Sequence, residues 1–219
     1  MVYENDQTGQ KAWLGIRMQG LSRELQAYWK VPQSGGIIIN KVYPESPASK
    51  AGLQAGDVIL AINDSALHIQ KDEETRKFQE MILAQSPGSS VKFKVFRNGK
   101  TFTAKIPLAA APKSIVVAES YPVPQLGFEI RELTRDVIYE DDLPLETPGV
   151  FVYQVDRASP AGQAGLGIGD IIQQINGKPV ASLESARKII ENELEPTEKI
   201  MFEVLSDRTT RFIFIDLKK

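Results

Sequence analysis

The chain has 219 residues, of which 42% are hydrophobic, 25% charged and 8% aromatic, a composition typical of a globular protein with packed cores. Its formal net charge of -2 and its pI near 5.6 provide no basic surface for nucleic acid or for an anionic membrane. Without cysteine it forms neither disulfides nor cysteine-based metal sites, and no apolar run approaches the ~20 residues that span a bilayer.

The first half of the chain is expected to alternate short strands with two helices. Leu14, Ile16 and Met18 alternate with Gly15 and Arg17, which is the period of a half-buried strand. In chain order, the further expected elements are a buried strand at 37–39, a helical turn at 46–52, a strand at 57–62, a helix at about 73–85, and a hairpin of 91–96 and 101–106.

The same order of elements returns in the second half. Leu126, Phe128 and Ile130 again alternate with polar or small residues. The elements expected after this strand are a buried strand at 150–152, a helical turn at 159–165, a strand at 170–175, a helix at about 183–194, and a hairpin of 200–205 and 211–217.

One segment of the first half returns clearly in the second half. Residues 46–59 read SPASKAGLQAGDVI, and residues 159–172 read SPAGQAGLGIGDII. The two copies are 113 residues apart. Solenoid repeats run to ~50 residues, so a repeat at this longer spacing indicates two whole domains. We expect a tail at 1–11, a first domain at 12–108, a linker at 109–114 and a second domain at 115–219.

The doubled signature closely resembles that of PDZ domains. It consists of Ser-Pro-Ala, Ala-Gly-Leu, Gly-Asp-Val-Ile or Gly-Asp-Ile-Ile, and Ile-Asn. The order of elements is similar to the circularly permuted variety of the bacterial HtrA/Deg serine proteases, and the resemblance covers residues 12–219. It implies an α+β fold of two tandem PDZ-like, partly open β-barrels, each with one short and one longer helix.

The resemblance also implies a binding site in each domain. Leu14, Gly15 and Ile16, and likewise Leu126, Gly127 and Phe128, stand where the family has the loop that binds a peptide carboxylate through backbone N–H groups. An extended peptide adds to the strand that follows this loop. The implied partners are C-terminal or extended hydrophobic peptides of other proteins, with no cofactor and no metal.

Helix periodicity predicts which side chains line each groove. In the first domain we assign Phe78 and Ile82 to the core, and in the second Ala186 and Ile190. The residues predicted to face the grooves are Met18, Met81 and Ala84 in the first domain, and Ile130 and Ile189 in the second. In the second domain, Tyr121-Pro122-Val123-Pro124-Gln125 replaces the aromatic run-up to the loop, and 133–148 is a longer insertion. The first domain is therefore the better candidate for peptide binding.

Two motifs resemble catalytic sites, but neither has the required pattern. Ser34-Gly35-Gly36 resembles the nucleophile segment of trypsin-like proteases, yet Gln33 stands where an aspartate belongs. His68, the single histidine, follows this serine, whereas the chymotrypsin-type order is His, Asp, Ser. We therefore predict no catalytic residue in this chain, a turn before a strand at Ser34, and an exposed loop position for His68.

Other polar and glycine-rich segments have structural explanations. The glycines of 165–169 precede a strand, whereas a dinucleotide-binding run follows a strand and opens a helix. Residues 140–142 lack the ligand spacing of a calcium loop. Asp57 and Asp170 occupy equivalent turns in separate domains, so we assign them structural roles.

The HtrA resemblance implies the peptide-recognition and regulatory region of an HtrA-like serine endopeptidase, acting in protein quality control. Its protease domain would precede this chain, residues 2–10 would end the linker from it, and the compartment would be the periplasm or cell envelope. The alternative is a free-standing adaptor of two PDZ domains, and a third hypothesis makes the domains spacers or oligomer contacts. Because the trimers of the family form through the protease domain, we expect this chain alone to be monomeric.

Overall fold

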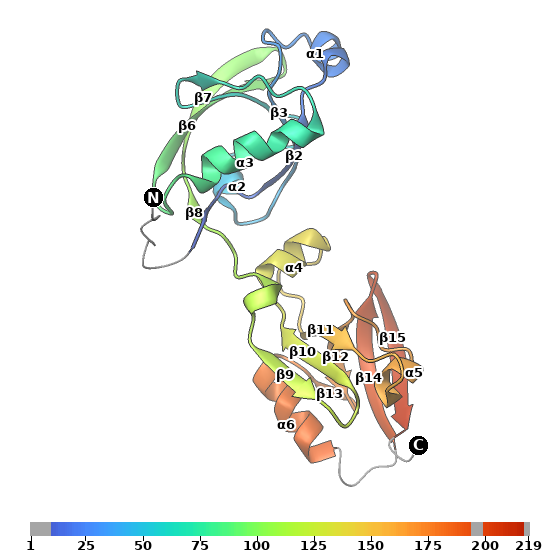
Figure 1. Cartoon of the computed structure of the whole chain (residues 1–219). Helices are drawn as coiled ribbons and strands as arrows, with labels where there is room; N and C mark the ends of the chain where they lie inside the picture. Colours follow the sequence, from blue (N-terminus) through green and yellow to red (C-terminus); the bar gives the residue numbers. More distant parts are fainter. Residues whose placement is uncertain (1–9, 194–198, 217–219) are drawn as a thin grey trace, which may run out of the picture. The chain divides into compact units, whose positions relative to one another are not determined.

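The computed structural model describes residues 10–193 and 199–216, and the chain divides into two compact units, residues 1–111 and 112–219. We call these units domain 1 and domain 2 and describe each by itself (Figure 1). Three predictions fall partly outside the described residues: positions 2–9 of the linker end, the last residue of the helix expected at 183–194, and the last residue of the strand expected at 211–217.

Domain 1 is built on an antiparallel sheet with the strand order β2-β3-β4-β6-β7, and β5 pairs with β4 off this path. Its strands are β1 (Ala12–Trp13), β2 (Ile16–Gly20), β3 (Ile37–Val42), β4 (Val58–Ile62), β5 (Ser65–Ala66), β6 (Ser90–Arg97), β7 (Lys100–Pro107) and β8 (Ala109–Ala110). Its helices are α1 (Arg23–Trp29), α2 (Pro47–Lys50) and α3 (Thr75–Leu83), with a 3-10 turn η1 (Asp72–Glu74) before α3.

The central strands of domain 1 are buried on both faces, at Ile37–Ile39 of β3 and along all of β4, which explains the unbroken apolar run of β3. Ile37 and Ile39 pack in the main core with Phe78 and Ile82 of α3, as the helix periodicity predicts. Ile38 points to the other face, where a smaller apolar cluster includes Leu25 and Trp29 of α1. A strand with apolar residues on both sides therefore lies between two helices.

Domain 2 repeats this plan in a sheet with the order β15-β14-β12-β11-β10-β9, and β13 pairs with β12 off this path. Its strands are β9 (Ser120–Val123), β10 (Phe128–Glu132), β11 (Val150–Val155), β12 (Ile171–Ile175), β13 (Lys178–Pro179), β14 (Lys199–Ser206) and β15 (Thr209–Asp216). Its helices are α4 (Arg135–Glu140), α5 (Pro160–Gln163) and α6 (Leu183–Glu193), with a 3-10 turn η2 (Ile115–Val117). Ala186 and Ile190 are fully buried in its core, which confirms their predicted orientation.

The short helical turns form where the sequence predicts them, because each carries its own start signal. Ser46 caps α2 by accepting a hydrogen bond from the Ser49 N–H at 3.1 Å, and Pro47 occupies the first helical position. Ser159 and Pro160 do the same for α5. Gly165 and Gly169 follow α5 with positive φ, so this glycine run is a helix stop and turn.

Some elements lie outside the predictions. Ala109 and Ala110, at the start of the predicted linker, form β8 and pair with β1, and the boundary between the units falls after Ala111. Helix α1 fills the connection between β2 and β3, and α4 fills the predicted insertion with three buried side chains of its own. Strand β9 adds to the edge of domain 2.

Candidate functional site

The loop that opens β2 holds its backbone carbonyls inward. The Leu14 carbonyl accepts a hydrogen bond from the Ala48 N–H, and the Gly15 carbonyl accepts one from the Tyr43 N–H, each at 3.0 Å. In a planar trans peptide the N–H points opposite to the carbonyl before it. The N–H groups of Gly15 and Ile16 are therefore aimed away from the domain, side by side.

Glycine is required in this loop for two reasons. Gly15 has φ of +84°, and a Cβ built on it would lie 2.2 Å from the Cβ of Ser46. Ser46 is fully buried and is the same side chain that caps α2. The loop and the first turn of α2 therefore pack directly against each other, a contact that the spacing of the two motifs did not predict.

Strand β2 continues from this loop along the edge of the sheet. Within the part of the chain that the structure describes, the pairing order leaves β2 bonded to β3 on one side and at the edge on the other. Ile16 and Met18 are half-buried and pack against the core together with Met81 of α3. Ala84, the remaining predicted groove residue of domain 1, is exposed at the C-cap of α3.

The strip formed by Ile16, Met18 and Met81 ends where η1 crosses β2. The Gly20 N–H donates to the Asp72 carboxylate at 2.9 Å, and a Cβ on Gly20 would lie 2.7 Å from the backbone of Lys71. The geometry therefore combines two adjacent backbone donors, a short strand edge and an apolar strip. Such an arrangement suits an extended chain that ends in an anion.

Domain 2 contains the same loop geometry. The carbonyls of Leu126 and Gly127 accept hydrogen bonds from the N–H groups of Ala161 (3.1 Å) and Asp156 (2.8 Å). Gly127 has φ of +75°, and a Cβ built on it would lie 2.1 Å from the Cβ of Ser159. The predicted residues Leu126, Gly127, Phe128 and Ile130 thus come together here, with Ile189 of α6 half-buried on the same core.

Asp57 and Asp170 have structural roles, as predicted. The Asp57 carboxylate is buried, accepts the Gln54 N–H at 2.9 Å and pairs with Arg97 at 2.5 and 2.6 Å. Asp170 likewise accepts the Gly167 N–H at 2.9 Å and pairs with Arg211 at 2.9 Å. Both carboxylates stabilise the turn that begins the following strand.

The serine and histidine considered above are also committed to local structure. His68 is exposed, and its Nδ1 lies 3.3 Å from the backbone carbonyl of Ser34. The Ser34 hydroxyl accepts a hydrogen bond from Gln70 at 2.8 Å. Gln33, which stands where a protease has its aspartate, donates to the carbonyls of Leu60 and Leu67. The segment is a cross-linked turn ahead of β3.

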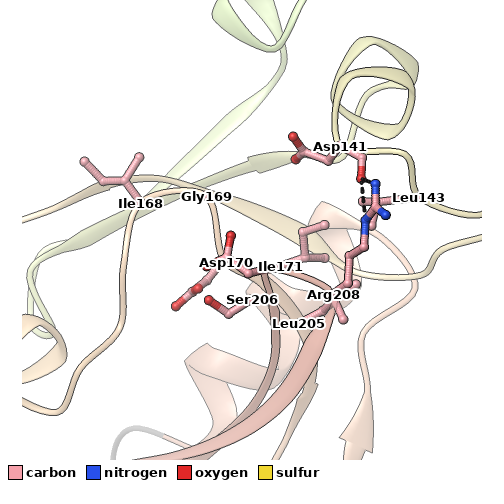
Figure 2. Close-up of a pocket in the computed structure, with 10 residues that line it drawn as sticks. Asp141, Leu143, Ile168, Gly169, Asp170, Ile171, Leu205, Ser206 and Arg208 are labelled. Carbon is pink, nitrogen blue, oxygen red and sulfur yellow. Dashed lines mark hydrogen bonds between the residues drawn. The ribbon is translucent and has the colours of Figure 1, made fainter. Parts of the chain in front are cut away.

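A polar cavity of about 410 Å³ lies elsewhere in domain 2, between the end of α4 and the β14–β15 turn (Figure 2). Arg208 donates to the Asp141 carbonyl at 3.1 Å and pairs with the Asp142 carboxylate at 3.1 Å. Burial raises the pKa of Asp141, and the neighbouring charge of Glu140 raises it further. Asp170 also lines the cavity, and its carboxylate is already paired with Arg211. The polar groups around the cavity therefore hold the neighbouring loops in place.

The described residues contain no group of three or more histidine, aspartate or glutamate side chains that could hold a metal ion. Within residues 10–193 and 199–216, no helix has the length and apolar character needed to cross a membrane.

Comparison with known proteins connects this geometry to a family. Residues 12–108 and 124–217 match the model of the PDZ domain. A probable periplasmic serine endoprotease, DegP-like, of Chlamydia trachomatis is 28% identical over 205 residues, which are 94% of this chain and 39% of the relative. Its counterpart in Marinomonas sp. is 30% identical over 181 residues, 82% of this chain and 37% of the relative. The chain spans about two fifths of the length of these relatives.

Solved structures of related proteins also match. The HtrA3 PDZ domain bound to a phage-derived ligand (FGRWV) is 27% identical with a TM-score of 0.39, covering 47% of this chain and 88% of that one. The HtrA-type protease AlgW with a decapeptide is 27% identical with a TM-score of 0.40, covering 48% of this chain and 31% of that one. By the family match over most of its length, the chain belongs to the PDZ domain family, of which it carries two copies.

Proposed function

We propose that domain 1 binds the C-terminal residues of other proteins. The carboxylate of the peptide accepts hydrogen bonds from the N–H groups of Gly15 and Ile16. The preceding residues pair antiparallel with β2. The observation that carries the proposal is a pair of hydrogen bonds, which the Leu14 carbonyl accepts from Ala48 and the Gly15 carbonyl accepts from Tyr43. With both carbonyls held inward, the next two N–H groups point to the sheet edge.

The apolar strip beside these donors sets the class of ligand. Ile16, Met18 and Met81 are half-buried and present aliphatic and thioether groups. An apolar last side chain fills this strip and removes its surface from water, while the flexible methionines adapt to its shape. Domain 1 therefore selects hydrophobic C-termini with modest discrimination among them.

The relatives supply the context of this proposal. The DegP-like relatives are named as probable periplasmic serine endoproteases. We infer that the chain is the substrate-recognition and regulatory part of such an endopeptidase in the periplasm or cell envelope, and that the peptides it binds belong to proteins destined for cleavage. A gene without a trypsin-like domain upstream of these residues would make the chain a free-standing adaptor.

Peptide titration tests the binding proposal in the full chain. The probe is a fluorescent decapeptide with an apolar last residue, prepared with a free and with an amidated C-terminus, and binding is followed by fluorescence anisotropy. We expect the amidated form to bind at least about tenfold more weakly, a loss of ~1.4 kcal/mol or more, because it no longer presents an anion to the two donors. Equal affinities would overturn the proposal.

A matched pair of variants on α3 locates the site. Met81→Lys places a charge in the apolar strip, and we expect it to weaken binding by about tenfold or more. Leu83→Lys changes the same helix at a side chain that is 45% exposed, and we expect affinity within about twofold of the native chain. Similar effects of both variants would contradict a groove at this position.

A further inference from the structure

In domain 2, the strand edge that corresponds to the open edge of β2 is occupied by the chain itself. Strand β9 pairs antiparallel with β10 along four residues, from Phe128 with Val123 to Arg131 with Ser120. Figure 1 shows β9 alongside β10, with α6 next to them. In domain 1 the strand before the loop, β1, turns away and pairs with β8 instead.

Val123 occupies the place that the proposed function gives to the last residue of a peptide. Its carbonyl oxygen accepts hydrogen bonds from the N–H groups of Leu126 at 3.1 Å and Gly127 at 2.9 Å, and Gly127 is the counterpart of Gly15, one of the two donors proposed in domain 1. Its side chain is buried in the apolar core that also contains Phe128 and Ile130. The carbonyl dipole thus replaces the carboxylate, and the valine replaces the apolar terminal side chain.

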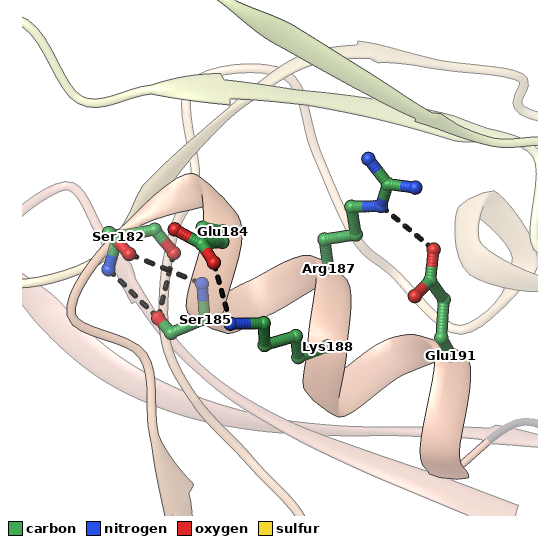
Figure 3. Close-up of polar contacts among 6 residues, drawn as sticks. All are labelled: Ser182, Glu184, Ser185, Arg187, Lys188 and Glu191. Carbon is green, nitrogen blue, oxygen red and sulfur yellow. Dashed lines mark hydrogen bonds and ion pairs between the residues drawn. The ribbon is translucent and has the colours of Figure 1, made fainter.

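Tyr121, two residues earlier, lies on the same face of β9 and reaches α6. Its hydroxyl donates to Glu191 at 3.4 Å, and the Arg187 guanidinium lies 5.5 Å from the centre of its ring. Figure 3 shows Arg187 and Glu191 paired along α6, where their side chains are 2.8 Å apart. Burial raises the pKa of Tyr121, and the charge of Glu191 raises it further.

The prolines of this segment suit a strand that closes a sheet. Pro122 has no N–H, and it faces Glu129 across the ladder. Because hydrogen-bonded and non-bonded pairs alternate in an antiparallel ladder, the bonded pairs are then Tyr121 with Ile130 and Val123 with Phe128. The outer edge of β9 lacks the donor that Pro122 cannot supply, so a further strand adds there poorly.

The side chains that line this groove are more deeply buried in domain 2 than in domain 1. Ile130 is 0% exposed and Phe128 4%, whereas their counterparts in domain 1, Met18 and Ile16, are half-buried. The PDZ match in the second domain begins at residue 124, directly after β9. The covering strand therefore lies outside the part of the sequence that resembles the family.

We propose that Ser120–Val123 is the intramolecular ligand of domain 2. The chain then has one open peptide site, in domain 1, and the domain 2 site accepts a peptide only when β9 leaves it. The groove is shaped for an aromatic side chain two positions before a β-branched aliphatic one, because Tyr121 and Val123 already fill it. This inference rests on the proposed function only in equating the groove with a peptide site.

Hydrogen exchange in the native chain tests the occupancy without any ligand or mutation. The Ile130 N–H is bonded to β9, whereas the equivalent Met18 N–H lies at a sheet edge, so we expect Ile130 to exchange at least about 100-fold more slowly by NMR. Exchange of Ile130 as fast as that of Met18 would overturn the inference. Because it needs no variant, this measurement decides the question even where a substitution unfolds domain 2.

Release of β9 tests the second site in the full chain. Val123→Asp puts a charge into the groove, and Val116→Asp is the control, since it adds the same charge upstream at a side chain that is 63% exposed. The probe is a peptide with the sequence of residues 118–123 and a free carboxylate, and a second peptide carries serine in place of the tyrosine and valine. We expect the native and control chains to bind one peptide, and the Val123→Asp chain to bind two, with shifts at Gly127 and Ile130.

The tyrosine- and valine-containing probe should bind the released site at least about tenfold more tightly than its serine version. Two sites in the native chain, or a folded Val123→Asp chain with one site, would contradict the inference. A native chain in which domain 1 binds no peptide, while Ile130 is protected and the released domain 2 binds, would refute the proposed function alone.

Discussion

At the scale of single residues, the binding loop depends on one close approach between the backbone of a glycine and the side chain of a serine. Gly15 lies so close to Ser46 that a methyl group added to the glycine would clash with the serine side chain, and the same is true of Gly127 and Ser159. Each serine is therefore both a helix cap and the floor of the loop. This double duty explains why the Ser-Pro-Ala and Leu-Gly motifs occur together in both halves of the chain.

Gly15→Ala should lower the free energy of unfolding of domain 1 by about 3 kcal/mol, from overpacking and a left-handed backbone. Ser46→Gly alone should cost about 0.5 kcal/mol, because glycine is a tolerable cap. The double variant should recover part of the alanine penalty, since the serine carbon that the new methyl group meets is gone. Strictly additive losses would contradict the contact. Both tryptophans, Trp13 and Trp29, lie in domain 1, so denaturation followed by tryptophan fluorescence reports this domain alone.

At the scale of elements, the helices differ in what they cover. Helix α3 closes the main core of domain 1, whereas α1 covers the opposite face of the sheet through Leu25 and Trp29. The start of α1 is marked by Ser22, which accepts a hydrogen bond from the Leu25 N–H at 3.3 Å, and Leu25 and Trp29 are four residues apart. Those signals are local and could have predicted the helix.

A matched pair within α1 separates burial from mere aromatic character. We expect Trp29→Phe to keep most of the contact, and Trp29→Ala to lower the free energy of unfolding by about 2 kcal/mol through lost burial. Tyr28 is 81% exposed, so Tyr28→Ala should change stability by less than about 0.5 kcal/mol. Urea denaturation followed by circular dichroism measures both. An equal loss for Tyr28→Ala and Trp29→Ala would refute the assignment of α1 to this second core.

At the scale of the whole molecule, the chain is two domains with separate apolar cores. One core contains residues of domain 1 only, and another contains residues of domain 2 only. Each antiparallel sheet is likewise complete within its unit. Among the described residues, neither domain takes a core residue or a sheet strand from the other.

Separate production of residues 10–111 and 112–219 should give two folded proteins. We expect each to unfold in a single cooperative calorimetric transition, because each retains its full core and sheet. The first fragment keeps both tryptophans, and the second keeps β9. A fragment with the circular dichroism and poorly dispersed NMR spectrum of an unfolded chain would contradict this division.

The sequence by itself determined the two domains, the strands that repeat in both halves, the longer helices α3 and α6, and the loop glycines, because these depend on local signals of periodicity, capping and turn chemistry. Asn98-Gly99 closes the β6–β7 hairpin with φ of 50° and 78°, as such a dipeptide predicts. The partners of Asp57 and Asp170 were decided only in three dimensions, because Arg97 and Arg211 reach equivalent carboxylates from different strands, β6 and β15.

The state of each binding edge was also decided by tertiary structure. Ser120–Val123 has a proline at its centre and another after it, so its local signal argues against a strand. It forms one because β10 supplies donors and acceptors, and because the core and α6 take up Val123 and Tyr121. Sequence alone identified two loops of the same kind. Only the pairing of residues distant in the chain made one edge open and the other closed, since strand pairing is a non-local interaction that no short motif records.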